Sequence, residues 1–86
     1  MIHSIISVIP RPDWKLQVTF SDGIEGLFDV NPYLNDEAFE DLKDVAEFMK
    51  IHNGRYFVEW ECGADLSSDT IYSLLVANKL ALHETV

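Results

Sequence analysis

The stretch that decides the fold runs from Trp14 to Val30 and reads WKLQVTFSDGIEGLFDV. Its first part alternates between apolar and polar residues, which is typical of a half-buried β-strand. The apolar positions of this strand are Trp14, Leu16, Val18 and Phe20. A turn signal over residues 21–23 separates it from a second apolar segment, residues 24–30, so the stretch predicts an antiparallel hairpin.

The length of the hairpin loop follows from the register. A two-residue turn at Asp22-Gly23 would put the apolar sets of the two strands on opposite faces. A three-residue loop, residues 21–23, pairs Leu16 with Phe28 and keeps both sets on one face. We therefore expect the longer loop, with Gly23 in the left-handed conformation of a G1 bulge.

A third strand precedes this hairpin. Residues Ile2–Ile9 are rich in Ile and Val, and apolar residues fall on both faces of the segment. Either both faces are covered, or a bulge shifts the register midway. Pro10 and Pro12 cannot donate to a strand ladder, so they predict a connection to the hairpin.

A helix is expected after the hairpin. Apolar side chains recur at helical spacing over about residues 37–48. Asp36 precedes the helix as a cap, and a break is expected near Asp44. Glu37 and Glu40 suit a first turn that faces the positive end of the helix dipole.

A second hairpin is predicted at Asn53-Gly54, the strongest short turn signal in the chain. A two-residue turn there pairs Ile51 with Tyr56, which places them on compatible faces. The following strand alternates, and its apolar side is Tyr56, Val58 and Trp60.

The last helix has clear start signals, with Ser67 as N-cap and Asp69 in the first turn. Its inward stripe is expected to be Ile71, Leu74 and Leu75. Tyr72 and Val76 widen this stripe, so the helix is either deeply buried or partly covered by another chain. Residues 80–86 carry no firm assignment, and we expect a mobile tail there.

These elements predict a single α+β domain over residues 1–86. A small antiparallel β-sheet, made of a meander of three N-terminal strands plus a later hairpin, packs with two helices. The hydrophobic content of 48% is too high for a disordered acidic segment. A single cysteine, Cys62, cannot form an intramolecular disulfide, which favours a reducing cytoplasm. No membrane span and no signal peptide are expected.

The charge balance of the chain is strongly acidic. Six Lys and Arg stand against fifteen Asp and Glu, a formal net charge of −9. This balance argues against direct binding of nucleic acid, which needs clustered basic residues. The acids concentrate over residues 37–47 and 59–69, so we expect a basic or an apolar partner surface to meet them.

The residues able to carry out chemistry form no recognisable motif. The histidines His3, His52 and His83 are far apart, so neither a metal nor a cofactor is expected. Asp65 lies where a strand ends and a helix begins, either as a site residue or as an organiser of the local turn. No catalytic residue is assigned, and the binding candidates are Trp60, Asp65, Tyr72 and Tyr33.

Several short motifs along the chain resemble one known family. They are Pro12-Asp13-Trp14, Leu16–Gly23, Phe28–Leu34, Phe39–Asp44 and Gly63-Ala64-Asp65-Leu66-Ser67. In this order, over about residues 5–75, they resemble the bacterial domain-of-unknown-function family 2442. Two positions depart from the family pattern: Ser68 stands where Pro is usual, and Cys62 where Pro, Asn or Gly is commoner.

The resemblance implies a small α+β domain with an antiparallel sheet, and no established activity. Some members of that family look like partners of small toxin-like proteins. Others carry an added helix-turn-helix domain and look like DNA-binding regulators, and this chain ends at Val86 without room for that domain.

Three functional hypotheses follow. The first is a non-catalytic protein-interaction module, the acidic antitoxin-like partner of a basic toxin-like protein. The second is a small-ligand binder or enzyme with a site near Asp65. The third is a DNA-associated regulator that lacks its own helix-turn-helix. A homo-dimer through the helix 72–80, or through an open sheet edge, is a separate expectation.

Overall fold

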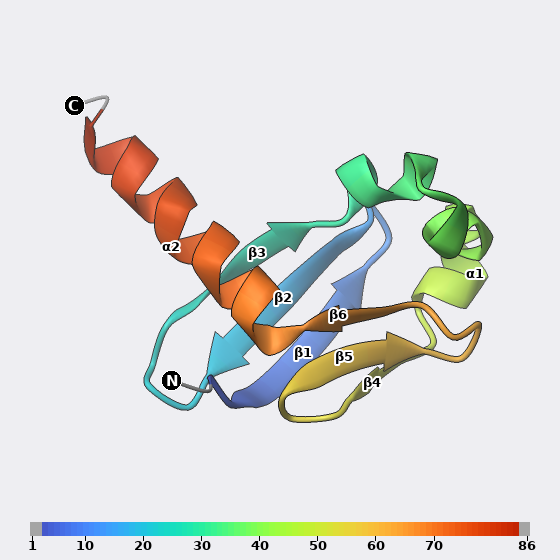
Figure 1. Ribbon diagram of the computed structural model, residues 1–86, viewed down its shortest axis with the longest axis horizontal. Coiled ribbons are helices and arrows are strands. Elements are labelled where there is room, and N and C mark those ends of the chain that lie inside the picture. Colours follow the sequence, from blue (N-terminus) through green and yellow to red (C-terminus); the bar gives the residue numbers. More distant parts are fainter. Residues whose placement is uncertain (1–2, 85–86) are drawn as a thin grey trace.

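Three antiparallel strands form the first sheet of the protein, in the order β1-β2-β3 (Figure 1). They are β1 (Ile5–Arg11), β2 (Lys15–Phe20) and β3 (Glu25–Asp29). The computed structural model describes the backbone of residues 3–84 and the side chains of residues 3–77. The predicted meander of three N-terminal strands is confirmed.

The hairpin of β2 and β3 has the predicted register. Leu16 lies opposite Phe28, and the Gly23 N–H donates to the Phe20 carbonyl at 3.0 Å. The φ of Gly23 is +91°, in the left-handed region that a G1 bulge requires. The three-residue loop is therefore confirmed, and the apolar faces of both strands point into the core.

Strand β1 carries the predicted bulge, since its register shifts between Ile5 and Ser7. The prediction that Pro10 marks a connection is wrong, because β1 continues through it with Pro10 opposite Leu16. In an antiparallel pair, the backbone groups of every second residue face a given neighbour. The Val30 N–H donates to the Trp14 carbonyl, so Leu16, two residues on, also faces β3. The N–H that Pro10 lacks is therefore not needed by β2.

The second sheet has the order β4-β5-β6. Its strands are β4 (Ile51–Asn53), β5 (Phe57–Trp60) and β6 (Asp65–Ser67). The later hairpin is confirmed as an element, and it lies beside β1 (Figure 1). Strand β6 was not expected, because its three residues read as a turn before the last helix.

The predicted register of the second hairpin is wrong. Ile51 lies opposite Trp60, not opposite Tyr56. The reason is the side chain of Asn53, whose Oδ1 accepts from the Arg55 N–H at 2.8 Å while its Nδ2 donates to the Ile5 carbonyl at 3.0 Å. These bonds lengthen the loop and tie it to β1. The slip is by an even number of residues, so Ile51 and Trp60 stay on compatible faces.

The segment expected as one helix over 37–48 consists of two pieces. They are the 3₁₀ helix η2 (Glu37–Lys43) and the single α-helical turn α1 (Val45–Phe48), preceded by a further 3₁₀ helix, η1 (Asn31–Asn35). The break at Asp44 is confirmed. Asp36 caps η2 as predicted, because its Oδ1 accepts from the Ala38 N–H at 3.0 Å.

The last helix, α2 (Ser68–Glu84), begins at the predicted cap. The Ser67 Oγ accepts from the Thr70 N–H at 3.2 Å. Beyond the sheets the helix projects away from the body of the protein (Figure 1). Residues 80–84 of the expected tail continue α2, whereas residues 85–86 lie outside the described residues.

One apolar core joins the inner faces of both sheets to the helices. Its members are Ile5, Leu16, Val18, Phe20, Phe28, Val30, Phe39, Leu42, Phe48, Val58, Trp60, Ala64, Leu66, Ile71 and Leu75. Helix α2 crosses the inner face of β3, where a Cβ on Gly26 would lie 3.2 Å from Leu75 Cδ2. Leu74 does not belong to the inward stripe as predicted, since 41% of its surface is exposed.

Candidate functional site

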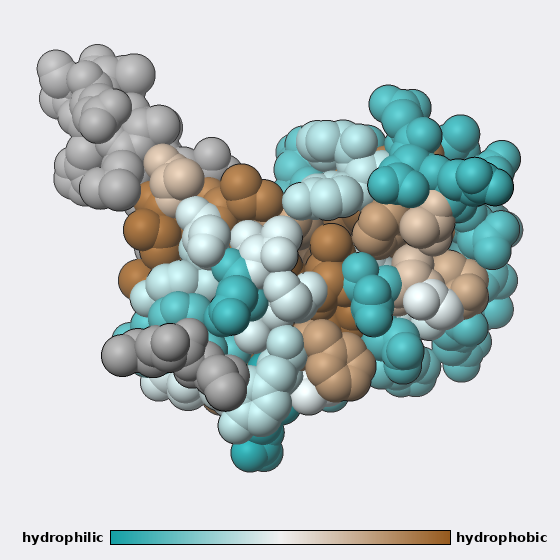
Figure 2. Space-filling model, in the orientation of Figure 1, coloured by the Kyte–Doolittle hydropathy of each residue, from teal (hydrophilic) through white to brown (hydrophobic). Residues whose placement is uncertain are grey.

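The most acidic surface of the protein lies over η2 and α1. Residues 36–47, here called the acidic segment, contain six Asp and Glu and one Lys. The inner side of this segment is anchored in the core by Phe39 and Leu42. Its outer side forms part of the hydrophilic area at the upper right of Figure 2. The alternation of buried apolar and exposed acidic residues therefore directs these acids to solvent.

Four acidic residues line an open hollow of about 500 Å³ on the acidic segment, namely Glu40, Asp41, Asp44 and Glu47. Two of them already have structural partners. Asp44 Oδ1 accepts from the Ala46 N–H at 3.0 Å, and Glu47 accepts from Lys50 Nζ at 3.1 Å. This hydrogen bond raises the pKa of Lys50. Glu40 and Asp41 are therefore the acids of the hollow best placed to meet a partner.

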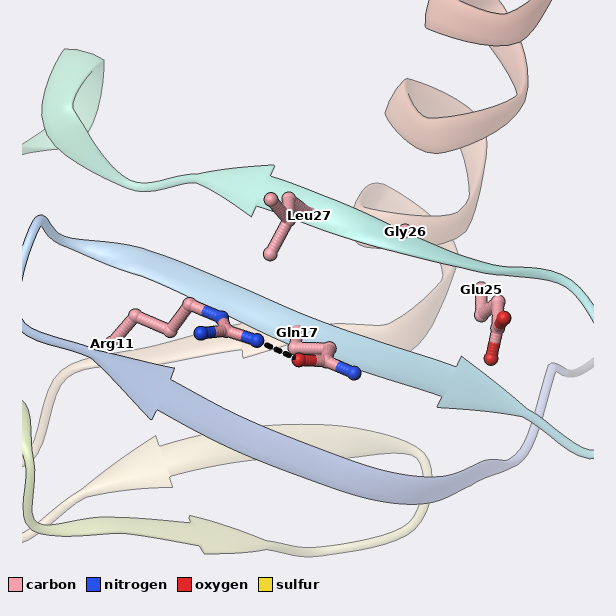
Figure 3. A pocket seen from close by; sticks show the side chains of 5 residues that line it. All are labelled: Arg11, Gln17, Glu25, Gly26 and Leu27. Carbon is pink, nitrogen blue, oxygen red and sulfur yellow. Dashed lines mark hydrogen bonds between the residues drawn. The ribbon is translucent and has the colours of Figure 1, made fainter.

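A second hollow lies on the outer face of the first sheet (Figure 3). It has a volume of about 340 Å³ and is lined by Arg11, Gln17, Glu25, Gly26 and Leu27. The Arg11 guanidinium donates to the Gln17 Oε1 across β1 and β2. Leu27, with 51% of its surface exposed, is an apolar side chain on this otherwise polar face.

A third hollow, of about 300 Å³, lies between the end of β3, η1 and α2. Its lining is mostly apolar and consists of Phe28, Asp29, Pro32, Tyr33 and Leu74. Tyr33, one of the candidates from the sequence, is half-buried here, with its ring 5.9 Å from that of Phe28. Of the binding candidates, Tyr33 is thus the one that lines a hollow.

Tyr72 serves to join three distant parts of the chain. Its hydroxyl donates to Asp22 Oδ2 at 2.7 Å, and the His3 ring stacks on the Tyr72 ring with centroids 3.5 Å apart. This hydrogen bond lowers the pKa of Asp22 and raises the pKa of Tyr72. The contacts hold the start of α2 against the β2–β3 loop and the N-terminal residues.

Removal of the Tyr72 hydroxyl is expected to cost stability in a pH-dependent way. The lowered pKa of Asp22 means that its contribution is present above the ordinary value of 3.8 and is lost as pH falls through the folded value. The raised pKa of Tyr72 means that its contribution is lost as pH rises above 10.0 through the folded value. Tyr72→Phe should therefore destabilise the protein at neutral pH and much less at about pH 2.

Urea unfolding at both pH values measures this difference, with Tyr56→Phe as the control. Tyr56 is exposed, so loss of its hydroxyl should leave the free energy of unfolding nearly unchanged. A Tyr72→Phe effect of equal size at both pH values would contradict the assigned role of the Asp22 bond.

The other two candidates do not join Tyr33 or Tyr72. Trp60 is buried, with 1% of its surface exposed, and its Nε1 donates to the Phe48 carbonyl at 2.8 Å. Asp65 is exposed on β6, opposite Glu59. Among the described residues the structure thus brings no two candidates into one hollow.

Two features of the candidate surface had little signal in the sequence. Leu27 interrupts the polar side of its strand, which is the pattern that could have revealed it. The exposure of Leu74 depends on where α2 crosses the sheet, and helical spacing alone does not give that crossing point. Within the described residues, no helix has the length and apolarity to cross a bilayer and no cluster of potential ligands could hold a metal ion.

Comparison with known proteins gives a family. The model of the family described as "Protein of unknown function (DUF2442)" matches residues 5–76 of the chain. The protein belongs to this family. Neither the curated proteins nor the solved structures gave a match. The DUF2442 match spans both sheets and the start of α2, and it confirms the resemblance seen in the sequence motifs.

Proposed function

We propose that this protein is a non-catalytic interaction module that binds a basic partner protein, in the manner of the acidic half of a toxin–antitoxin pair. The observation that carries the proposal is the acidic segment, whose acids face solvent while its apolar residues enter the core. An acidic surface of this kind attracts a positively charged partner at long range.

The distribution of polar groups supports the same proposal. Ser68 is the one buried polar residue among the side chains that the structure describes. The titratable groups with resolved pKa shifts, Asp22, Lys50 and Tyr72, are engaged in hydrogen bonds at the surface. The described charges are thus arranged to face a partner in solution.

Capture with two charge-reversed variants tests this function. The first variant combines Glu40→Lys with Asp41→Lys in the acidic segment. The second combines Glu59→Lys with Asp65→Lys, exposed acids on the second sheet, and makes the same change in net charge. The immobilised chain is exposed to lysate of its native cells at about 50 mM salt and then washed at about 500 mM salt.

The wild type and the second variant should retain a stoichiometric basic protein at low salt and release it at high salt. The first variant should lose it. Capture of no protein, or equal capture by the first variant, would contradict the proposal. Loss of capture in the second variant alone would place the binding surface around Asp65 instead.

A further inference from the structure

Strand β3 is the outer strand of the first sheet, since its partner on one side is β2 and the strand order ends with it (Figure 1). The direction of its backbone groups follows from two hydrogen bonds. The Phe20 N–H donates to the Ile24 carbonyl at 2.8 Å, and the Val30 N–H donates to the Trp14 carbonyl at 2.9 Å. Ile24 and Val30 therefore face β2, and so do the residues at even positions between them.

The three remaining residues of β3 turn their backbone groups the other way. Glu25, Leu27 and Asp29 lie opposite Thr19, Gln17 and Lys15 on β2, in the pairs that exchange no hydrogen bonds. Each of the three thus offers one N–H and one carbonyl to the open edge. Within the described residues, no backbone hydrogen bond outside the sheet satisfies these groups.

The side chains along this edge are acid, apolar and acid. Glu25 and Asp29 are exposed, and Leu27 between them has 51% of its surface exposed. Asp29 also accepts from Asn31 at 3.0 Å, and Lys15 lies opposite it. Glu25 is opposite Thr19, so its charge has no basic neighbour across the pair. The most negative point of the edge is therefore at Glu25.

A second copy of the chain fits this edge poorly. Antiparallel self-pairing with Leu27 opposite its own copy would place Glu25 opposite Asp29 at both ends. Like charges directly opposite each other destabilise a strand pair. A strand with Lys or Arg on both sides of an apolar residue would instead match the charges of Glu25 and Asp29 and cover Leu27.

The inner side of the same edge offers an apolar site. The hollow between Phe28, Tyr33 and Leu74 lies there, at the end of β3. Since successive side chains of a strand point to opposite faces, an added strand would place its alternate side chains toward this hollow. An apolar residue at that position would cover Leu74, whose surface is 41% exposed.

From these observations we infer that the edge of β3 binds an extended segment of the partner by strand addition. The segment carries a basic, an apolar and a basic residue on its outer face and an apolar residue on its inner face. Backbone hydrogen bonds supply affinity, and the alternate side chains supply specificity. The inference rests on the proposed function, because it assigns the docking surface of the basic partner.

The test is an NMR titration of the isotope-labelled chain with the capped peptide Gly-Lys-Thr-Ile-Leu-Lys-Gly. The same peptide with Glu in place of both Lys is its control. We expect saturable shifts of the amides of Glu25, Leu27 and Asp29 with the basic peptide. The acidic peptide should bind about tenfold more weakly or less, since like charges then face each other.

Two variants separate the edge from general electrostatics. Leu27→Pro removes the outward N–H without removing a bond to β2, in the way that Pro10 is accommodated in β1. It should weaken the basic peptide about tenfold. Glu25→Lys should weaken it about threefold, whereas Glu59→Lys, with the same charge change on β5, should leave it unchanged.

Several results would overturn the inference. They are shifts that avoid β3, equal binding of the two peptides, and unchanged binding by a folded Leu27→Pro variant. If Leu27→Pro does not fold, equal weakening by Glu25→Lys and Glu59→Lys has the same meaning. A dimer in light scattering that Glu25→Lys strengthens would assign the edge to a second copy. Failure of the peptide titration leaves the capture of a basic partner intact, so the two proposals fail separately.

Discussion

Replacement of Trp60 by alanine is expected to lower the free energy of unfolding by about 3–5 kcal/mol. The Trp60 ring is buried with 1% of its surface exposed, and it packs against Phe39 and Phe48 with centroids 6.3 and 5.8 Å away. Its removal leaves a cavity where the second sheet meets η2 and α1. A domain of this size has about 5–15 kcal/mol in total, so the loss is a large part of its stability.

Trp60→Phe separates packing from hydrogen bonding. Phenylalanine keeps much of the ring but loses the Nε1 donor, which leaves the Phe48 carbonyl without its 2.8 Å partner. An unsatisfied buried acceptor costs about 1–3 kcal/mol. Urea unfolding followed by far-ultraviolet circular dichroism should thus rank wild type above Trp60→Phe, and Trp60→Phe above Trp60→Ala. A loss below about 1 kcal/mol for Trp60→Ala would contradict the placement of this ring in the core.

Replacement of Leu42 by alanine is expected to cost about 2–5 kcal/mol. The Leu42 side chain is fully buried and anchors η2 in the core. The Leu42 carbonyl also accepts from the Trp14 Nε1 at 2.6 Å, and this bond holds Trp14 at a φ of +62°. Backbone in this region is strained for residues other than glycine. A cavity at Leu42 therefore weakens the contact that fixes the β1–β2 turn.

Tryptophan fluorescence during urea unfolding measures the effect, because both tryptophans contact this part of the core. The control is Val45→Ala on α1, where 38% of the side chain is exposed and the expected loss is about 1 kcal/mol or less. Equal losses at Leu42 and Val45 would show that η2 is not anchored as described, and the acidic segment would lose its fixed position.

The sequence predicts the first sheet well because the buried face fixes its register. Only one loop length puts the apolar sides of β2 and β3 together, so Gly23 could be placed in its turn from the alternation alone. The second hairpin lacks this discrimination. A slip by an even number of residues keeps Ile51 and Trp60 on compatible faces, and the choice falls to Asn53, whose bond to the Ile5 carbonyl is a long-range contact.

The candidate site was less accessible to prediction. Aromatic residues near a strand-to-helix corner suggested a site at Trp60, Asp65 and Tyr72, but the sequence does not show which ring enters the core. Trp60 does so, and Tyr72 bonds to a loop fifty residues away. The edge of β3 depends on strand order and backbone direction, which follow from the assembled sheet. The acidic surface, in contrast, follows directly from composition and helix pattern.

The most direct test of the account is the affinity of the captured partner at two ionic strengths. Isothermal titration at about 50 and 500 mM salt, with the wild type and the two charge-reversed pairs, compares the contributions of the two acidic surfaces. We expect affinity that falls with salt and falls again when Glu40 and Asp41 are reversed, with no change when Glu59 and Asp65 are reversed. A partner whose affinity is independent of salt and of Glu40 and Asp41 would contradict the acidic segment as the binding surface.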